Sequence, residues 1–591
     1  MTAAKLDLRT APFRDARYAP RNLQIERRAG GEIVLSNPTT FSERFQTATA
    51  ALAHWAHAAP ERVWLAERSG EGWRTLTYAE AWQRVQALAG GLREAGIIGS
   101  RPLMILSNNG VDHALLRYAA MSQGMPVAAV SPQYGLPGAN LARLTHACEA
   151  LRPAAVYTED AVLFGEGLSA PALAGLPVIA LRNQRRGDIP LERLYGSARA
   201  TATAQPADHA IYLLTSGSTG LPKAVISTHQ TISVNAAQIE ACFDDPEPPV
   251  MVHSAPWSHV LGASSILHMV LHRGGALYID WGQPTASRFG ETIRNLREIS
   301  PTYQQMVPAG WMLMAAELEK DQALARRFFD RLRLMQYGGA TLSQATADRI
   351  EKVAIKTIGE RISFGSGYGA TEAGTVCNVH WLNDRTGMIG LPLPGTSVRL
   401  VPEFGKLGFR VKGPQVSPGY LGRPDLSERA FDEEGFHILG DAARFADPAS
   451  PDQGMIFDGR ISENFKLASG TFIGVSELRV GAVGAIGGAV TDAVVCGEGE
   501  AAVGLLLYPN PTLPRHEIEA AVREGLTRFN AEAKGGGPPI ARALVLPSPP
   551  DPAKGEITDK GYISQVIARG LRADAVQRLY LDPVAADVMQ F

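Results

Sequence analysis

The 591-residue chain has few cysteines and almost no net charge. Its four cysteines are scattered and form no Cys-x-x-Cys pair, which argues against a disulfide framework and against a cysteine zinc site. Lysine and arginine (57) nearly balance aspartate and glutamate (59), so the net charge of −2 provides no basic field for nucleic acid and no polybasic membrane signal. The composition therefore indicates a reducing compartment and no nucleic-acid partner.

Long apolar segments are also missing. The longest such stretch, VGAVGAIGGAV at 480–490, is too short and too rich in glycine to span a bilayer. Residues 1–21 mix both charges without an apolar core, so no signal peptide is expected. These absences predict a cytoplasmic protein without a membrane partner.

The order of apolar segments predicts an α/β protein. From about residue 100 to 400, strand-like and helix-like runs alternate, as in 102–109, 111–123 and 126–132, which predicts a parallel sheet covered by helices. After residue 400, short strand-like runs separated by glycine and proline predict a β-rich subdomain, followed by a smaller α+β region. We place the domain boundary so that a large N-terminal domain covers 1–459 and a small C-terminal domain covers 460–591.

Three local signals lie near the N-terminus. Residues 22–38 are predicted to form a hairpin that turns at Gly30-Gly31. Thr40 with Glu43 predicts a capping box that opens a helix over 41–59. Thr77 with Glu80 predicts a second capping box, and Gly96 is expected to end the helix that follows.

The stretch LLTSGSTGLPKAVIS at 213–227 combines glycines, hydroxyl side chains and a lysine, but it lacks the Gly-Lys-Ser/Thr of a Walker loop. Apolar runs at 210–215 and 223–227 are strand-like, so the loop is expected to join two strands rather than a strand and a helix. Backbone N–H groups, hydroxyls and the Lys223 ammonium could hold phosphate oxygens. An ordinary hairpin turn is the alternative.

Three further stretches carry polar side chains typical of nucleotide sites. YGATE at 368–372 ends in Glu372, and Mg²⁺ near phosphates needs only one or two such carboxylates. LGDAARF at 439–445 contains Asp441, whose carboxylate could accept both hydroxyls of a ribose, and GRISENFK at 459–466 contains Arg460 and Lys466. Taken singly, each residue also has an ordinary structural explanation: Glu372 as a surface carboxylate, Asp441 as a turn former and Arg460 as a salt-bridge partner.

Taken together and in this order, the motifs resemble the adenylate-forming superfamily of acyl-CoA ligases, peptide-synthetase adenylation domains and luciferases, over about residues 40–565. The resemblance implies that a carboxylate and ATP form an acyl-adenylate and pyrophosphate, and that the acyl group then passes to a thiol. ATP, Mg²⁺ and CoA are the implied cofactors. No protein nucleophile is needed, because positioning and charge stabilisation supply the rate.

The resemblance assigns roles residue by residue. The phosphate loop would comprise Thr215, Ser216, Gly217, Ser218, Thr219, Gly220 and Lys223. The adenine and acyl pockets would be lined by YGGAT at 337–341, with Gly338, Gly339 and Ala340, and by Tyr368, Gly369 and Ala370. Thr371 would contact the α-phosphate, Glu372 would hold Mg²⁺, and Asp441 would bind ribose with Arg460 and Lys466 nearby. The catalytic set would be Lys560, Glu372, Thr371 and Lys223.

The acyl substrate is predicted to meet three separate segments. PWSHVLG at 256–262 resembles the family's aromatic-His segment and nominates His259 and Gly262, although His259 could simply pack at a helix start. Tyr303 and Gly338 complete the predicted substrate contacts. The segment 302–314 offers apolar surface and amides, which suits an aromatic ring with a polar substituent.

Two positions depart from the family pattern. Ser462 stands where an aspartate or lysine usually marks the pivot of the small domain, and we expect the hinge to persist because it needs permissive backbone rather than charge. In the segment 551–565, aligning Gly555 with the family glycine places Glu556 at the catalytic lysine position, whereas aligning Gly561 places Tyr562 there. We assign the lysine to Lys560, with Lys554 as the alternative.

The C-terminal segment, an extra residue between Lys466 and Gly470, and the N-terminal region all resemble feruloyl-CoA synthases. The sequence therefore predicts a CoA ligase for a hydroxycinnamic acid such as ferulic acid. A ligase that loads a carrier protein, a ligase for a non-cinnamic acid, and a nucleotide-binding homologue without catalysis remain the alternatives. A homodimer is the default expectation.

Overall fold

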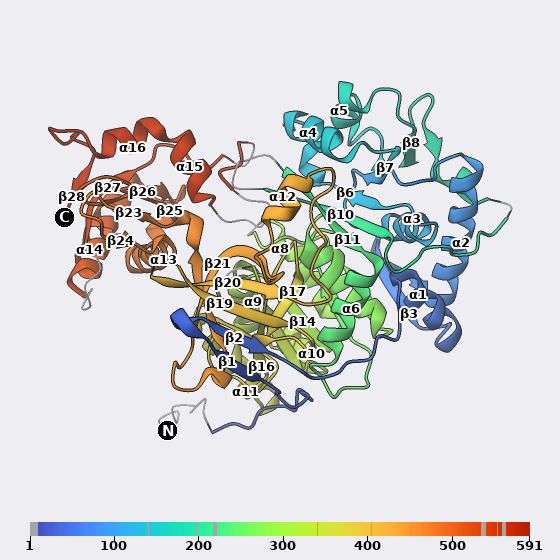
Figure 1. Ribbon diagram of the computed structural model, residues 1–591, viewed down its shortest axis with the longest axis horizontal. Helices are drawn as coiled ribbons and strands as arrows, with labels where there is room; N and C mark the ends of the chain where they lie inside the picture. The colour runs from blue at the N-terminus through green and yellow to red at the C-terminus, as the bar shows by residue number, and fades with distance from the viewer. Residues whose placement is uncertain are drawn as a thin grey trace.

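The computed structural model of the protein describes residues 10–591 apart from 140, 197, 217–221, 286, 340, 404, 533–538, 552–553 and 558–562. Over these residues the protein is α/β, with large sheets covered by helices, as predicted (Figure 1). The described strands form an 11-stranded sheet, a 7-stranded sheet, two 4-stranded sheets and a 2-stranded pair. No helix among the described residues is both long and apolar enough to cross a membrane.

The seven-stranded sheet confirms the predicted strand–helix–strand alternation. Its strands, in spatial order, are β11 (Pro222–Thr228), β10 (His209–Ser216), β6 (Val127–Ala129), β5 (Leu103–Ile105), β7 (Ala155–Asp160), β8 (Val178–Arg182) and β9 (Ile189–Pro190). All neighbours from β10 to β9 are parallel, whereas β11 folds back antiparallel on β10. Parallel neighbours need crossover connections. These are α3 (Val111–Ser122), α4 (Leu141–Leu151) and α5 (Gly165–Leu168).

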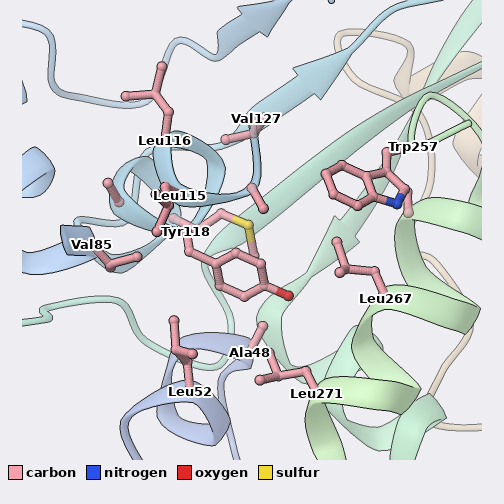
Figure 2. Packing of buried hydrophobic residues seen from close by; sticks show 14 of the residues in the cluster. Ala48, Leu52, Val85, Leu115, Leu116, Tyr118, Val127, Trp257, Leu267 and Leu271 are labelled. Carbon is pink, nitrogen blue, oxygen red and sulfur yellow. The ribbon is translucent and has the colours of Figure 1, made fainter. Parts of the chain in front are cut away.

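A four-stranded sheet and a layer of helices enclose the largest apolar core. The strands are β12 (Val250–His253), β13 (Ala276–Ile279), β3 (Val63–Ser69) and β4 (Gly72–Thr77). The layer of helices contains α3 together with α1 (Ala48–Ala58), α2 (Tyr78–Glu94), α6 (His229–Glu240) and α7 (Leu267–His272). Figure 2 shows Trp257 and Tyr118 in this core with Leu271. Burial of Trp257 therefore anchors the segment 256–262 to the core.

The 11-stranded sheet is mixed. Its strands, in spatial order, are β1 (Gln24–Arg27), β2 (Ile33–Ser36), β19 (Ser397–Glu403), β20 (Lys406–Lys412), β21 (His437–Phe445), β22 (Met455–Arg460), β18 (Met388–Pro392), β17 (Gly374–Asn378), β16 (Ser363–Ala370), β15 (Leu334–Tyr337) and β14 (Tyr303–Met306). β14, β15 and β16 are parallel, and the other pairs are antiparallel. The antiparallel part contains the predicted β-rich region after residue 400.

Helices cover the parallel end of this sheet with a core of their own. They are α8 (Phe289–Glu298), α9 (Pro308–Lys320), α10 (Gln322–Phe329) and α11 (Gln344–Ile358). The short helix α12 (Pro424–Arg429) lies between β20 and β21 in the chain. The carboxyl ends of β14, β15 and β16 thus stand at one edge, where the next chain segments carry the predicted pocket residues.

The C-terminal residues form a smaller α+β region, which Figure 1 shows at one side of the protein. Its strands are β23 (Phe465–Lys466), β24 (Phe472–Ile473), β25 (Val490–Cys496), β26 (Val503–Pro509), β27 (Ile540–Val545) and β28 (Met589–Gln590). Its helices are α13 (Val475–Ile486), α14 (Arg515–Glu532), α15 (Gln565–Leu571) and α16 (Ala573–Leu579). Two apolar clusters in this region draw their buried residues from Phe465 onward.

The local N-terminal signals had different outcomes. β1 and β2 form the predicted hairpin, and Thr77 and Glu80 form the predicted reciprocal capping box of α2. The Thr40 capping box is wrong, because α1 begins only at Ala48 and its cap is Thr47, which accepts the Ala50 N–H. Residues 37–47 form neither helix nor strand, and Asn37 at their start donates to the Pro392 carbonyl (2.9 Å).

Candidate active site

The predicted phosphate loop connects the antiparallel strands β10 and β11, as the sequence indicated. Thr215 pairs with Lys223 and Ser216 pairs with Pro222, next to the loop that connects the two strands. Gly217, Ser218, Thr219 and Gly220 lie outside the described residues. The loop is therefore positioned by a β-hairpin and not by the helix start of a Walker loop.

The outer edge of β11 is held by the segment 417–421. The Ile226 N–H donates to the Gly419 carbonyl (3.0 Å), and the Leu421 N–H donates to the Ala224 carbonyl (2.8 Å). The Ser417 hydroxyl donates to the Ile226 carbonyl (2.7 Å). These bonds fix the segment that carries Tyr420 beside the strand that carries Lys223.

Tyr420 brings Lys223 and Glu372 together. The Lys223 ammonium lies 5.3 Å from the centre of the Tyr420 ring, within cation–π range. The Tyr420 hydroxyl donates to Glu372 Oε1 (3.1 Å). Burial, and then the Glu372 charge, raise the pKa of Tyr420 well above its usual value, so the hydroxyl stays a donor. Sequence analysis missed Tyr420, since its role depends on contacts with two distant motifs.

A second polar group unites Tyr368, Asp441 and Arg460. The Tyr368 hydroxyl donates to Asp441 Oδ2 (2.5 Å), and Arg460 Nε lies 3.3 Å from Asp441 Oδ1. Asp441 and Arg460 are register partners in β21 and β22. The Tyr368 ring packs against Phe409, with ring centres 4.9 Å apart. The predicted ribose carboxylate and predicted adenine tyrosine are thus adjacent.

Glycines allow close approaches around these groups. A Cβ at Gly338 would lie 2.9 Å from Gln305 Nε2, and a Cβ at Gly369 would lie 2.1 Å from the Gly374 carbonyl oxygen. Gly339 adopts φ of +82°, which favours glycine. Ala370 pairs with Gly374 at the end of β16, and Ala340 lies outside the described residues. Gly339 and Gly369 therefore require glycine, whereas Gly338 leaves room beside the flexible end of Gln305.

A small pocket links the carboxylate to the predicted substrate segment. It is lined by Ser227, Thr231, Ile232, Asn235, Val260, Ser264, Thr371, Glu372, Gly374, Gln415 and Ser417. Its wall includes both predicted phosphate-side residues, Thr371 and Glu372, and part of the π-helix Leu261–Ile266. The predicted phosphate side and the predicted acyl side therefore share one pocket.

His259 and Gly262 shape the entry into this π-helix. The His259 N–H donates to the Pro256 carbonyl (3.1 Å), and the His259 carbonyl accepts from the Ala263 N–H (2.8 Å). A Cβ at Gly262 would lie 2.5 Å from the Pro256 carbonyl oxygen. The turn thus depends on glycine, while His259 is half-buried.

Tyr303 does not line the pocket that contains Thr371 and Glu372. It begins β14 and is buried with its ring 6.0 Å from the Phe243 ring, edge to face. Gln305 and Met306, at the other end of β14, pair with Gln336 and Tyr337 directly before Gly338. The end of β14 next to Gly338 therefore carries Gln305 and Met306, whereas the sequence analysis named Tyr303 as the substrate contact.

The predicted pivot follows β22, the last strand of the large sheet. Ser462 lies in the short 3₁₀ turn Ile461–Glu463. Lys466 is exposed in the two-residue strand β23, paired with Phe472. The turn and the exposed strand lie directly after Arg460, which belongs to the Asp441 group.

The predicted catalytic Lys560 lies outside the described residues, but its neighbours are informative. Glu556 is 1% exposed, accepts two bonds from Arg572 (2.7 Å each) and accepts one from the Tyr508 hydroxyl (3.0 Å). The alignment that puts Glu556 at the lysine position therefore points to a buried structural ion pair. Lys554 is exposed, with Nζ 3.6 Å from Asp551 Oδ2.

Helix α4 lies between this C-terminal segment and the β10–β11 hairpin that carries the predicted phosphate loop, here called the phosphate hairpin. A Cβ at Gly555 would lie 2.2 Å from Arg143 Nη2, so the segment approaches α4 closely. His146, one turn further along α4, hydrogen-bonds with the carbonyl of Pro222, the first residue of β11 (2.9 Å). The segment preceding Lys560 thus sits on the same helix as the base of the phosphate loop.

Comparisons with known proteins agree with this arrangement. Residues 52–421 match the family of AMP-binding enzymes. The chain is 28% identical to a carboxylic acid reductase of Mycobacterium tuberculosis over 68% of its own length, but spans only 37% of that protein. It is 26% identical to 4-coumarate–CoA ligase 5 of Oryza sativa, covering 62% of this chain and 68% of the relative. It is also 26% identical to a feruloyl-CoA synthase of Amycolatopsis, covering 63% and 72%.

Solved structures share the fold. ATP-bound MatB from Rhodopseudomonas palustris superposes with a TM-score of 0.70 at 20% identity, covering 90% of this chain and 100% of that one. The adenylation domain of a carboxylate reductase from Mycobacterium chelonae gives a TM-score of 0.73 at 20% identity, covering 90% and 91%. The family match covers more than half of the chain and includes the phosphate hairpin and Glu372. The chain therefore belongs to the AMP-binding enzymes, the adenylate-forming superfamily that its motifs resemble.

Proposed function

We propose that the protein is an ATP-dependent acid–CoA ligase that converts a hydroxycinnamic acid, such as ferulic acid, to its CoA thioester through an acyl-adenylate. The observation that carries the proposal is the meeting of Lys223 and Glu372 around Tyr420, beside a pocket that the predicted substrate segment also lines. Family membership supports the adenylation step. The relatives named 4-coumarate–CoA ligase and feruloyl-CoA synthase support the acid class.

The phosphate side of the site would bind and orient ATP. Lys223 and the loop N–H groups would hold the β- and γ-phosphates, and the Thr371 hydroxyl would contact the α-phosphate. Because the substrate carboxylate itself attacks the α-phosphorus, the role of these groups is positioning and charge stabilisation.

Glu372 fits the role of a magnesium ligand. Its Oε1 accepts from Tyr420, and Oε2 accepts no bond from any side chain that the structure describes. Mg²⁺ commonly takes one or two carboxylates together with substrate phosphates and water, and a single available carboxylate beside Lys223 meets that need. When bound, the ion would neutralise phosphate charge.

The nucleoside side would be formed by Tyr368, Asp441 and Arg460. Asp441 would accept the two ribose hydroxyls in place of part of its present bonding to Tyr368 and Arg460. Tyr368 would pack on the adenine. Arg460 has 47% of its side-chain surface exposed, so it can follow a bound ribose without leaving the Asp441 charge unpaired.

The region 460–591 would act as a mobile domain that turns about Ser462. In one pose Lys560 would bridge the attacking carboxylate and the α-phosphate, and in a second pose CoA would reach the acyl-adenylate. The close approach of Gly555 to Arg143 supports the first pose, because it places the segment before Lys560 against the helix that contacts the phosphate hairpin.

The test is pyrophosphate release and thioester formation by the purified full-length protein with ATP, Mg²⁺ and CoA. Cinnamic, benzoic and medium-chain fatty acids are compared, with a reaction without ATP as the control. We expect kcat/KM for 4-hydroxycinnamic acids to exceed that for octanoate at least about tenfold, a difference of roughly 1.4 kcal/mol. A higher value with octanoate would overturn the aromatic assignment.

A second acceptor is favoured by the carboxylic acid reductase relatives. A neighbouring solved structure is an adenylation and peptidyl-carrier didomain of such a reductase, with a TM-score of 0.73 at 19% identity. The acyl group of this protein would then pass to a phosphopantetheine thiol on a carrier protein. Supplying CoA and a loaded carrier protein in parallel distinguishes the two acceptors, since only the true acceptor gives a thioester at a catalytic rate.

A further inference from the structure

His253 and Gln305 form a hydrogen-bonded pair that bridges two sheets. His253 ends β12 in the four-stranded sheet, and Gln305 lies in β14 of the 11-stranded sheet. His253 Nε2 lies 2.8 Å from Gln305 Oε1. The two residues are only 8% and 6% exposed. A bond between nearly buried polar groups fixes its partners more firmly than one at the surface.

The chemistry of His253 fixes which way the Gln305 amide points. The Ala255 N–H donates to His253 Nδ1 (3.2 Å), so Nδ1 is the acceptor and the proton of the neutral ring is on Nε2. Burial lowers the pKa of His253 to about 4, which keeps the ring neutral near pH 7. Nε2 therefore donates, Gln305 must present its oxygen to His253, and the amide NH₂ must point the other way.

The NH₂ group points toward Gly338. A Cβ at Gly338 would lie 2.9 Å from Gln305 Nε2, so the glycine leaves room for a ligand atom on this side of the amide. Over the described part of the chain, Gln305 Nε2 donates no hydrogen bond, although the residue retains some exposed surface. An amide donor without a partner in a mostly buried position is costly unless a ligand or water accepts from it.

The position of β14 separates this donor from the nucleotide groups. β14 is the edge strand, and β15 lies between it and β16, which carries Tyr368. Gln305 is therefore on the opposite side of β15 from Tyr368 and Asp441. His253 lies three positions before the start of the predicted substrate segment 256–262. The donor thus faces the acyl side of the site.

We propose that Gln305 is a specificity-determining residue that donates an N–H to an oxygen on the substrate acid, remote from its carboxylate, and that His253 is the positioning residue that holds the amide in this orientation. The inference rests on the proposed function and narrows its substrate class to acids with such an acceptor, for example a phenolic oxygen. A pocket built around a donor discriminates against an analogue without the acceptor, because the donor is then left unpaired.

The test compares 4-hydroxycinnamate with unsubstituted cinnamate, using ATP-dependent pyrophosphate release by the full-length protein. Gln305→Met keeps the side-chain length and removes the donor. It should lower kcat/KM for 4-hydroxycinnamate by about 3- to 10-fold and change that for cinnamate by less than about twofold. The loss should lie mainly in KM, because the bond is present in both ground and transition states.

Two variants of His253 separate positioning from packing. His253→Leu removes the Nε2–H that holds the Gln305 amide. It should reduce the preference for 4-hydroxycinnamate, as Gln305→Met does. His253→Gln can place its Nε2 near the position of the imidazole Nε2, so it should retain the preference. If His253→Leu does not fold, Gln305→Met with the His253→Gln comparison still decides the question.

Three outcomes would overturn the inference. An unchanged preference in Gln305→Met would show that the amide does not contact the acid. Equal losses on both acids would show a purely structural role. Failure of the unmutated protein to activate any aromatic acid would instead overturn the proposed function, and this inference with it, and would be visible before any variant is made. The KM for ATP should remain within about twofold in each variant, since the pair lies away from Tyr368 and Asp441.

Discussion

Replacing Tyr420 with phenylalanine should weaken the apparent affinity for Mg²⁺ without removing the phosphate-loop lysine. The change deletes the hydroxyl that donates to Glu372 Oε1 and keeps the ring beside the Lys223 ammonium. A hydrogen bond to a charged group contributes about 1.5–3 kcal/mol, and the lower end applies because both side chains are only half-buried. About 1.4 kcal/mol corresponds to a tenfold change in affinity. Mutating a residue that orients a metal ligand typically lowers metal affinity by about 10- to 100-fold, so a tenfold loss is at the lower end of that range.

The measurement is ATP–pyrophosphate exchange as a function of Mg²⁺ concentration. Tyr420→Phe should need about tenfold more Mg²⁺ for half-maximal rate, and its rate at saturating Mg²⁺ should stay within about threefold of the unmutated protein. Tyr508→Phe is the matched control, because it also removes a tyrosine hydroxyl that donates to a glutamate, here Glu556 at 3.0 Å in the C-terminal region. An unshifted Mg²⁺ curve in Tyr420→Phe would refute the reasoning.

Three further outcomes are expected. Lys560→Ala should slow acyl-adenylate formation by about 10²–10³ and spare CoA attack on supplied acyl-adenylate, whereas Lys554→Ala should have a small effect on both half-reactions. Kinetics of each half-reaction test this, and a larger effect of Lys554→Ala would contradict the assignment. Glu372→Gln should lose ATP turnover most at limiting Mg²⁺, so equal turnover there would refute the metal role. Burial lowers the pKa of His113 to about 3 and of His229 to about 4. The unfolded chain therefore takes up these protons first as pH falls below about 6.5, and the free energy of unfolding should decrease between about pH 6.5 and 4, as denaturant titrations at each pH would show.

Sequence patterns predicted the local features of this fold well where the signal is short-range. The capping box at Thr77 needs only a residue three positions away, and the hairpin around the phosphate loop needs only two apolar runs. Thr40 shows the limit of such signals. The segment that contains Thr40 starts at Asn37, which bonds to Pro392 more than 350 residues away, and no local pattern contains that contact.

The parts of the candidate site that sequence analysis missed are long-range contacts between separate strands. Tyr420 acts on Glu372 from 48 residues away, and His253 acts on Gln305 from 52 residues away. Which of Tyr303 and Gln305 faces the pocket depends on the direction of β14 and on its place at the sheet edge. One sequence gives the alternation of side chains along a strand, but the neighbours of that strand come only from the assembled sheet.

The phosphate hairpin is connected to both predicted catalytic regions through its own backbone. On one side, β11 bonds to the segment 417–421, so Tyr420 and Glu372 are fixed relative to Lys223. On the other side, the Pro222 carbonyl bonds to His146 of α4, the helix that Gly555 approaches. A Walker loop relies on the start of a helix to fix its N–H groups. This hairpin instead takes its position from a sheet edge. If the C-terminal region moves across α4 as proposed, we therefore expect β11 and Glu372 to keep their positions relative to each other.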